Sequence, residues 1–272
     1  APCFLCTRGE LMQPKIAVVL GSGGLRGVSQ LGVLKVLEDE NIKIDHIVGC
    51  SMGSLIGALY CCGHTTENIL KLAMNLKREH WFDVKLGKMG FCSGERALTI
   101  MRLLTQRRQF HETDIALSIV AADINDGEEV VFSEGSVAEA VRASISIPGV
   151  FVPYQMGDML LVDGAVVNPT PIDVAFNNGA DIVIAVDLSY ASTFYKINNF
   201  FDVIIKSIDI MEHELMKNRI NDENVIMIRP DVGHISPSSF DNMEEAVALG
   251  EEATKELVSK IKELIDLHNN KG

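Results

Sequence analysis

Residues 46–62 read HIVGCSMGSLIGALYCC, a stretch that joins a short apolar run to a longer apolar segment rich in small residues. The first part is typical of a buried strand, and the second predicts a fully buried helix. Between them stands a G-x-S-x-G motif, Gly49-Cys50-Ser51-Met52-Gly53. A serine between a strand and a helix in this motif is held on a sharp turn with its hydroxyl exposed, and the flanking glycines leave room for neighbouring backbone. Ser51 is therefore a candidate nucleophile.

A glycine-rich turn precedes this stretch. Gly21-Ser22-Gly23-Gly24-Leu25-Arg26-Gly27 follows an apolar run over residues 15–20 and opens a segment with helical periodicity over residues 27–40. Backbone N–H groups of such a turn can face an anion. A dinucleotide loop, a structural turn and an oxyanion hole are the possible interpretations. A dinucleotide loop calls for glycine where Arg26 stands and for an acidic residue about twenty positions on. We favour an oxyanion hole, which a serine nucleophile needs.

A third motif, Asp163-Gly164-Ala165, ends the apolar run over residues 159–162. A carboxylate at the end of a strand lies where α/β folds collect their site residues. Taken alone, an Asp-Gly pair after a strand is typical of an ordinary turn. Asp163 therefore becomes a candidate site residue only in combination with the two earlier motifs.

The three motifs, in this order, resemble those of the patatin-like phospholipases, especially small bacterial members related to the catalytic domain of neuropathy target esterase. Residues 143–153, ASISIPGVFVP, also look like the family's A-S-x-x-x-P-x-x-F-x-P segment. The resemblance covers about residues 15–190. One departure is Ser22, which stands where the family's usual G-G-G-x-R/K-G loop has its first glycine.

This resemblance implies an α/β fold of three layers, with a central, mainly parallel sheet and helices on both faces. It also implies a Ser51/Asp163 dyad without a catalytic histidine. An aspartate near its reference pKa of ~3.9 is a weak base, so the dyad needs a partly desolvated Asp163. The implied oxyanion hole uses the backbone of Gly23, Gly24, Leu25 and Arg26, and the motif glycines are Gly21, Gly27, Gly49, Gly53 and Gly164. The side chain of Arg26 is expected to anchor the loop.

The function that the resemblance implies is lipid acyl hydrolysis, in which esters of phospholipids or lysophospholipids are cleaved through an acyl-enzyme. A thioesterase or small-ester esterase is the nearest alternative, and a regulatory protein that keeps the fold without turnover belongs to a different class. No cofactor and no metal are expected. The partner is a lipid substrate, with peripheral membrane contact, and the oligomeric state stays open.

An ordinary α/β-hydrolase with Ser, Asp and His in that order is the competing mechanism. Three histidines follow Asp163, and two of them, His213 and His268, fall in predicted helices. Only His234 lies in a loop that could reach a site. Because such an elbow normally follows several more strands than this chain has before residue 51, we favour the dyad.

Composition limits the partners and the compartment. The chain has 272 residues and a formal net charge of −13, which opposes a nucleic-acid partner. No run approaches the ~18 apolar residues of a membrane-spanning helix, and the beginning of the chain lacks the pattern of a secretory signal. Its six cysteines show no disulfide framework, and the isolated Cys3/Cys6 pair is unlike a zinc site. We expect a cytoplasmic protein with a disordered or added tail over residues 1–14 and one domain over residues 15–270.

Two further segments carry expectations about the site. Residues 77–108 contain eight Lys and Arg against three Asp and Glu, a net charge of +5, together with aromatic residues. They suit a rim where lipid enters, although a solvated helical face with core aromatics is the plainer interpretation. A helix predicted over residues 196–219 has a wide apolar stripe. Its simplest interpretation is a well-buried helix, and the alternatives are a cover over an acyl channel or a subunit contact.

The remaining elements follow from periodicity and turn signals. Residues 115–123 and 128–132 flank an Asn-Asp-Gly turn, which predicts a hairpin. Further on, the pattern predicts a helix from about residue 171, strands over 181–187 and 224–228, and a final helix over 241–268.

Overall fold

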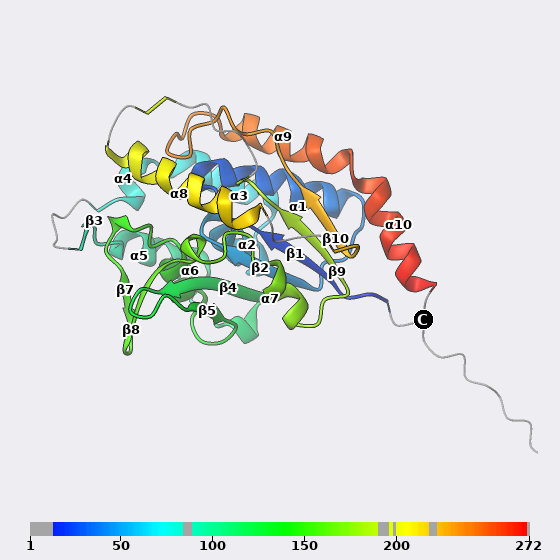
Figure 1. The fold of residues 1–272 in the computed structure, drawn as a ribbon, viewed down its shortest axis with the longest axis horizontal. Helices are drawn as coiled ribbons and strands as arrows, with labels where there is room; N and C mark the ends of the chain where they lie inside the picture. Colours follow the sequence, from blue (N-terminus) through cyan, green and yellow to red (C-terminus); the bar gives the residue numbers. More distant parts are fainter. Residues whose placement is uncertain (1–12, 84–88, 190–195, 198–199, 218–221, 271–272) are drawn as a thin grey trace, which may run out of the picture.

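In the computed structural model, a mixed sheet of eight strands forms the centre of the chain. The structure describes residues 13–83, 89–189, 196–197, 200–217 and 222–270 (Figure 1). The strands are β1 (Ile16–Leu20), β2 (His46–Cys50), β3 (Gly90–Cys92), β4 (Ala116–Asp123), β5 (Glu129–Phe132), β6 (Gly149–Phe151), β7 (Tyr154–Met156), β8 (Met159–Asp163), β9 (Ile182–Val186) and β10 (Val225–Ile228). The α-helices are α1 (Ser29–Asp39), α2 (Met52–Cys61), α3 (Thr66–Asn75), α4 (Arg78–Trp81), α5 (Glu95–Leu104), α6 (Val137–Ser144), α7 (Ile172–Asn177), α8 (Phe200–Met216), α9 (Met243–Lys255) and α10 (Val258–Asn269). Short 3-10 helices are η1 (Gly24–Val28), η2 (Phe110–Glu112) and η3 (Gly164–Val166).

The strand order in the sheet is β10-β9-β1-β2-β4-β8-β7, and β5 also pairs with β4. Neighbouring strands from β10 to β4 are parallel, whereas β5, β7 and β8 join by antiparallel pairing. Strands in the centre of a parallel sheet are covered on both faces and are therefore apolar throughout. The sequences IAVVL of β1 and IVIAV of β9 are buried along their whole length. The mainly parallel sheet predicted from the sequence is confirmed.

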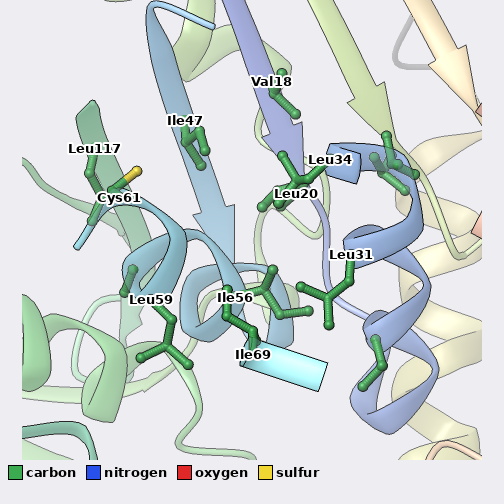
Figure 2. Packing of buried hydrophobic residues seen from close by; sticks show 14 of the residues in the cluster. Val18, Leu20, Leu31, Leu34, Ile47, Ile56, Leu59, Cys61, Ile69 and Leu117 are labelled. Carbon is green, nitrogen blue, oxygen red and sulfur yellow. The ribbon is translucent and has the colours of Figure 1, made fainter. Parts of the chain in front are cut away.

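Helices cover both faces of this sheet. On one face, Val18 and Leu20 of β1 meet Leu31 of α1 and Ile56 of α2 in the main core (Figure 2). On the other face, alternate residues of the same strand pack against α7 in a second core. Figure 1 shows α9 beside α1 on the outside of the first face. The predicted three-layer α/β architecture is thus confirmed.

Strand register brings three distant segments together. Leu20 at the end of β1 pairs with Gly49, so the turn after β1 and the turn after β2 lie at the same edge of the sheet. Cys50 pairs with Val120 of β4, and the next residue of β4, Ala121, pairs with Asp163 at the end of β8. The G-x-S-x-G turn, the glycine-rich turn and Asp163 therefore become neighbours.

Some predicted elements differ from those observed. The hairpin is confirmed as β4 and β5, which pair antiparallel. The prediction of a single final helix over residues 241–268 was wrong, because the helix is interrupted between α9 and α10. Its apolar periodicity continues across the interruption, since Leu257, Ile261 and Leu264 all contact the main core. The three short strands β3, β6 and β7 were not predicted, and β6 pairs with β3 in a separate small sheet.

Several expectations fall partly outside the described residues. Residues 1–12 of the expected tail, which include Cys3 and Cys6, lie outside the described residues. Lys85 and Lys88, two of the basic residues of the segment over residues 77–108, also lie outside them. The helix expected over residues 196–219 is described in part, as α8. Within the part of the chain that the structure describes, no helix combines the length and apolarity needed to cross a bilayer.

Candidate active site

Ser51 occupies the sharp turn between β2 and α2. Its backbone has φ 53° and ψ −122°, a conformation that L-residues rarely adopt and that costs free energy. The turn can approach β1 only because Gly53 lacks a side chain: a Cβ there would lie 1.9 Å from the carbonyl oxygen of Leu20. Ser51 is also the N-cap of α2, so the positive end of the helix dipole faces its side chain.

The Ser51 hydroxyl donates a hydrogen bond to Asp163. The distance from Ser51 Oγ to Asp163 Oδ2 is 2.6 Å, and the other carboxylate oxygen, Oδ1, accepts the Ala165 N–H at 3.0 Å. Burial raises the pKa of Asp163 to about 7, although the hydrogen bonds from Ser51 and Ala165 act in the opposite direction. A carboxylate with this pKa can accept a proton near neutral pH, unlike an exposed aspartate.

The glycine-rich turn after β1 lies next to Ser51. Gly23 and Gly24 have φ angles of 153° and 59°, and both line a cavity that Ser51 also lines. The N–H of Leu25, which we expected to face the site, instead donates to the carbonyl oxygen of Pro237 at 2.8 Å. Gly23 and Gly24 are therefore the better placed candidates for anion binding.

The other motif glycines stand at close backbone contacts. A Cβ on Gly21 would lie 2.7 Å from the carbonyl oxygen of Val186, and one on Gly164 would lie 2.5 Å from that of Val120. A Cβ on Gly27 would meet the side chain of Met52. Each of these glycines lets two segments of the site approach one another.

Arg26 is fully buried beneath the glycine-rich turn. Its Nε donates to the carbonyl oxygen of Gly23 at 3.2 Å, and its Nη2 donates to Asp209 Oδ1 of α8 at 2.8 Å. Through these two bonds, the side chain ties the turn to α8.

Two serines to which the sequence analysis gave no role hold the backbone of Ser51 and Asp163 by hydrogen bonds. Ser144 Oγ accepts the Ser51 N–H at 2.8 Å and donates to the carbonyl oxygen of Val120 at 2.7 Å. The carbonyl oxygen of Ser146 accepts the Asp163 N–H at 3.0 Å. Both serines belong to the ASISIPGVFVP segment, so the signal that could have found them was the family resemblance of that segment.

A second buried carboxyl group, that of Glu212, lies in the site. Its residue is 4% exposed, and its side chain is hydrogen-bonded to that of Ser22. Burial raises its pKa to about 8, and the charges of Asp209 and Asp163 act in the same direction. Sequence reasoning missed Glu212 because an acidic residue inside a predicted amphipathic helix carries no motif.

Two cavities meet at Ser51. The larger has a volume of about 170 Å³ and is lined mainly by apolar side chains, among them Leu55, Leu72, Phe151 and Ile205. The smaller has a volume of about 30 Å³, and its lining includes Asp163 and Glu212. Ser51 thus lies beside a large apolar space and beside a small one whose lining includes the carboxyl groups of Asp163, Asp209 and Glu212.

The histidines lie elsewhere. His234 Nε2 is 2.9 Å from Glu245 Oε1 at the exposed surface. The ring Nδ1 of His213 is 3.1 Å from the carbonyl oxygen of Ser189. Among the described residues that line the two cavities at Ser51, none is a histidine. The geometry therefore gives no support to the alternative Ser-Asp-His arrangement.

The segment over residues 77–108 contributes aromatic rings more clearly than charge. Trp81 and Phe82 line the large cavity together with Arg78. Phe91 meets Phe200 of α8 edge to face, with ring centroids 5.7 Å apart. In contrast, Arg108 is paired with Asp114 at 3.1 Å. At the cavity, the expected rim is therefore represented by two aromatic residues, Trp81 and Phe82, and by one basic residue, Arg78.

Helix α8 has one face on the site and one in solvent. Ile205 and Ile208 of its inner face line the small cavity with Glu212. On the outer face, large apolar side chains are about half exposed, namely Phe200, Val203, Ile210 and Met211. The expectation of a well-buried helix was wrong for this face, because the described part of the chain covers it only in part, as where Phe91 packs on Phe200.

The sequence of the chain is similar to those of known proteins. The family model for patatin-like phospholipase matches residues 18–176. An uncharacterised NTE family protein of Mycobacterium tuberculosis is 33% identical over 192 residues, which cover 70% of this chain and 53% of that protein. Patatin-like phospholipase domain-containing protein 6 of Homo sapiens is 33% identical over 181 residues, which cover 64% of this chain and 13% of that protein.

A solved structure shares the fold. VipD from Legionella pneumophila matches with a TM-score of 0.59 at 14% identity, over 94% of this chain and 67% of that one. At that identity the likeness concerns the fold alone. The chain spans about half the length of the mycobacterial relative, so the match concerns this domain and not the whole of that protein. Because the family match extends over more than half of its 272 residues, the chain belongs to the patatin-like phospholipase family.

Proposed function

We propose that this protein is a serine lipid acyl hydrolase that cleaves acyl esters of phospholipids or lysophospholipids. The observation that carries the proposal is the 2.6 Å hydrogen bond from the Oγ of Ser51, a residue that lines the large apolar cavity, to the buried Asp163 carboxylate. A nucleophile within hydrogen-bond reach of a base is the arrangement that acyl transfer requires.

The reaction follows from the roles of these groups. Asp163 accepts the hydroxyl proton as Ser51 Oγ attacks the ester carbonyl carbon, and the N–H groups of Gly23 and Gly24 stabilise the resulting oxyanion. The leaving alcohol takes the proton from Asp163. Water then hydrolyses the acyl-enzyme. No cofactor or metal is needed for any of these steps.

The acyl chain of the substrate would occupy the large cavity. Its lining of aliphatic and aromatic side chains suits a hydrocarbon chain, and Ser51 lies where the ester would follow that chain. The half-exposed apolar side chains on the outer face of α8 suit peripheral contact with a lipid surface while the inner face covers the site.

Two measurements together test this function. A fluorophosphonate probe should label the wild-type protein at Ser51 and leave Ser51→Ala unlabelled, because labelling requires an activated serine. A panel of phospholipids, lysophospholipids, thioesters and short esters, read by mass spectrometry, then identifies the substrate class. Release of fatty acid only from thioesters or short esters would contradict the lipid assignment. Absence of both labelling and hydrolysis would favour a regulatory protein that keeps the fold.

A further inference from the structure

We propose that Glu212 is a positioning residue, which holds the water molecule that hydrolyses the acyl-enzyme. The inference rests on the proposed function, because it concerns the second half of that reaction. It goes beyond the Ser51/Asp163 pair by assigning a role to a third carboxyl group of the site, contributed by α8.

The size of the small cavity selects its occupant. A cavity needs about 10–15 Å³ to hold one water molecule, and this one measures about 30 Å³. It therefore has room for water and is too small for an acyl chain or a lipid headgroup. Its wall contains Ser51, Asp163 and Glu212 together, so water in it lies beside the nucleophile, the base and the third carboxyl group at once.

Glu212 has a polar atom available for such a water molecule. Its Oε2 is buried, and among the described residues it has no hydrogen-bond partner. Buried polar atoms in proteins are normally satisfied by protein groups or by ordered water. The side chain also has a hydrogen bond with Ser22, at the position where the sequence departs from the family's usual glycine. Glu212 thus lines the cavity with a side chain whose Oε2 has no partner among the described residues.

Deacylation can then be written with every atom accounted for. The oxygen of the held water forms a bond to the acyl carbonyl carbon, and Asp163 accepts a proton from that water. When the tetrahedral intermediate collapses, the bond from the carbonyl carbon to Ser51 Oγ breaks, and Oγ takes the proton back from Asp163. A carboxylic acid leaves, and the free enzyme is restored.

The surroundings keep Glu212 compatible with this role. Four ionisable groups act on or near it: Asp209 on the same helix, Asp163 from β8, Arg26 from η1 and the buried Cys50 thiol from β2. Burial and the neighbouring carboxylates raise the pKa of Glu212 to about 8, so the group is largely neutral at pH 7. A neutral carboxyl can hydrogen-bond to water without repelling the oxyanion that forms at Ser51.

Pre-steady-state kinetics with a p-nitrophenyl ester separate the two halves of the reaction. Glu212→Met keeps a similar side-chain volume and removes both oxygens. We expect its burst of p-nitrophenolate, which reports acylation, to resemble that of the wild type. Steady-state turnover, which reports deacylation, should fall on the order of 10²-fold because the water loses its fixed position. The acyl adduct on Ser51 should then accumulate and be visible by intact-protein mass spectrometry.

Two variants serve as comparisons. Glu212→Gln retains hydrogen-bonding atoms and should restore most of the deacylation rate. Glu214→Gln makes the same chemical change at an exposed position of the same helix and should behave as the wild type. A structural role of Glu212 would instead lower burst and turnover in proportion, together with the melting temperature.

The outcomes separate this inference from the proposed function. Wild-type turnover with an unchanged ratio of burst to steady-state rate in Glu212→Met would overturn the role of Glu212 and leave the proposed function intact. A wild-type protein that hydrolyses no ester would overturn the proposed function, and the role of Glu212 with it. If Glu212→Met does not fold, the same ratio measured in Ser22→Ala decides the matter, since loss of the Ser22 hydrogen bond should slow deacylation selectively.

Discussion

Ser51 and Asp163 lie 112 positions apart in the chain, yet a single 2.6 Å hydrogen bond joins their side chains. Residues that act as one unit lose activity together and not additively. Ser51→Ala and Asp163→Asn should each reduce ester hydrolysis by on the order of 10³-fold or more, and the double variant should be little worse. Initial rates with a soluble ester test this expectation.

The histidine alternative provides the control for these variants. His234→Ala should retain most of the activity, because the ring is bonded to Glu245 at the surface. Asp163→Asn is nearly isosteric and should shift thermal unfolding only modestly. Near-normal turnover by Asp163→Asn, with an inactive His234→Ala, would contradict the assignment of the base.

The buried position of Asp163 also predicts a pH dependence. Burial raises the pKa of this carboxyl to about 7, and only its ionised form can accept the Ser51 proton. The value of kcat/KM for a soluble ester should therefore rise about tenfold per pH unit below neutral pH and level off above about pH 7. A profile already flat from pH 5 upwards would mean that Asp163 has an ordinary pKa or is not the base.

At the residue scale, the G-x-S-x-G motif predicted Ser51 from its local signature, whereas Asp163 was predicted only from the combination of three motifs and the family resemblance. Glu212 has no such signature. Its role depends on which face of α8 turns inwards and on the position of Ser22, and both are tertiary facts. The N–H of Leu25 was assigned to the site by resemblance alone, and the approach of Pro237 directs it elsewhere.

Among the helices, α1 and α9 approach each other at two glycines. A Cβ on Gly250 would lie 1.9 Å from the carbonyl oxygen of Ser29, and one on Gly32 would lie 2.1 Å from that of Val247. Alanine favours a helix over glycine by about 1 kcal/mol, but overpacking against backbone costs more. We expect Gly250→Ala to lower the free energy of unfolding by about 2 kcal/mol, as measured by urea denaturation.

A neighbouring exposed position shows whether the backbone contact is the cause. Glu252→Ala lies on the solvent side of α9 and should change the free energy of unfolding by less than about 0.5 kcal/mol. A Gly250→Ala protein more stable than the wild type would show that the two helices can separate at little cost.

Helix α8 leads to a prediction about the physical form of the substrate. Val203 and Ile210 on its outer face are 50% and 56% exposed. Each apolar side chain that inserts into a lipid surface contributes about 1.5–3 kcal/mol to the free energy of binding. Removing one therefore weakens partitioning of the protein to the lipid surface about tenfold or more. Val203→Ser combined with Ile210→Ser should therefore slow hydrolysis of lipid in vesicles and leave hydrolysis of a soluble ester unchanged.

A control for this variant comes from another helix. Leu267 of α10 is 50% exposed, and Leu267→Ser should affect neither substrate form. Equal rates of vesicle hydrolysis by the wild type and by the α8 variant would remove this face from the lipid-binding surface.

At the element scale, periodicity identified the long strands and helices, including β1, β2, α2 and the β4–β5 hairpin. It failed where elements are short or where apolar spacing continues across an interruption. β3, β6 and β7 have three residues each, too few for a period to be seen. The half-exposed face of α8 could not be predicted, since an apolar stripe does not say how much of it the rest of the chain covers.

Across the whole molecule, the site concentrates groups that oppose folding. Ser51 has a strained backbone, and two carboxyl groups, Asp163 and Glu212, are removed from water. The core on both faces of the sheet offsets these costs. The favourable packing of the core thus allows the protein to stay folded with a site that lowers its stability, as is common in enzymes.

The buried carboxyls make stability depend on pH in a specific direction. Burial raises the pKa of Asp163 from 3.8 to about 7 and that of Glu212 from 4.5 to about 8. At a pH between the unfolded and folded pKa values of a carboxyl, the folded protein holds more protons than the unfolded chain. The stabilisation that the two protonated carboxyls contribute is therefore fully present below about pH 4 and is lost as the pH rises to about 8. We expect the free energy of unfolding to fall across this range by up to about 1.4 kcal/mol per pH unit for each of the two carboxyls.

Urea denaturation at intervals from pH 4 to pH 8 measures this slope directly. Asp163→Asn combined with Glu212→Gln removes both titrating groups and should flatten the curve relative to the wild type. Glu214→Gln, on the exposed side of α8, should leave the slope nearly unchanged, because the hydrogen bond from Lys217 lowers the pKa of Glu214 by more than burial raises it. Parallel curves for the wild type and the double variant would mean that both carboxyls titrate as they do in the unfolded chain. Desolvation would then explain neither the basicity of Asp163 nor the neutrality of Glu212.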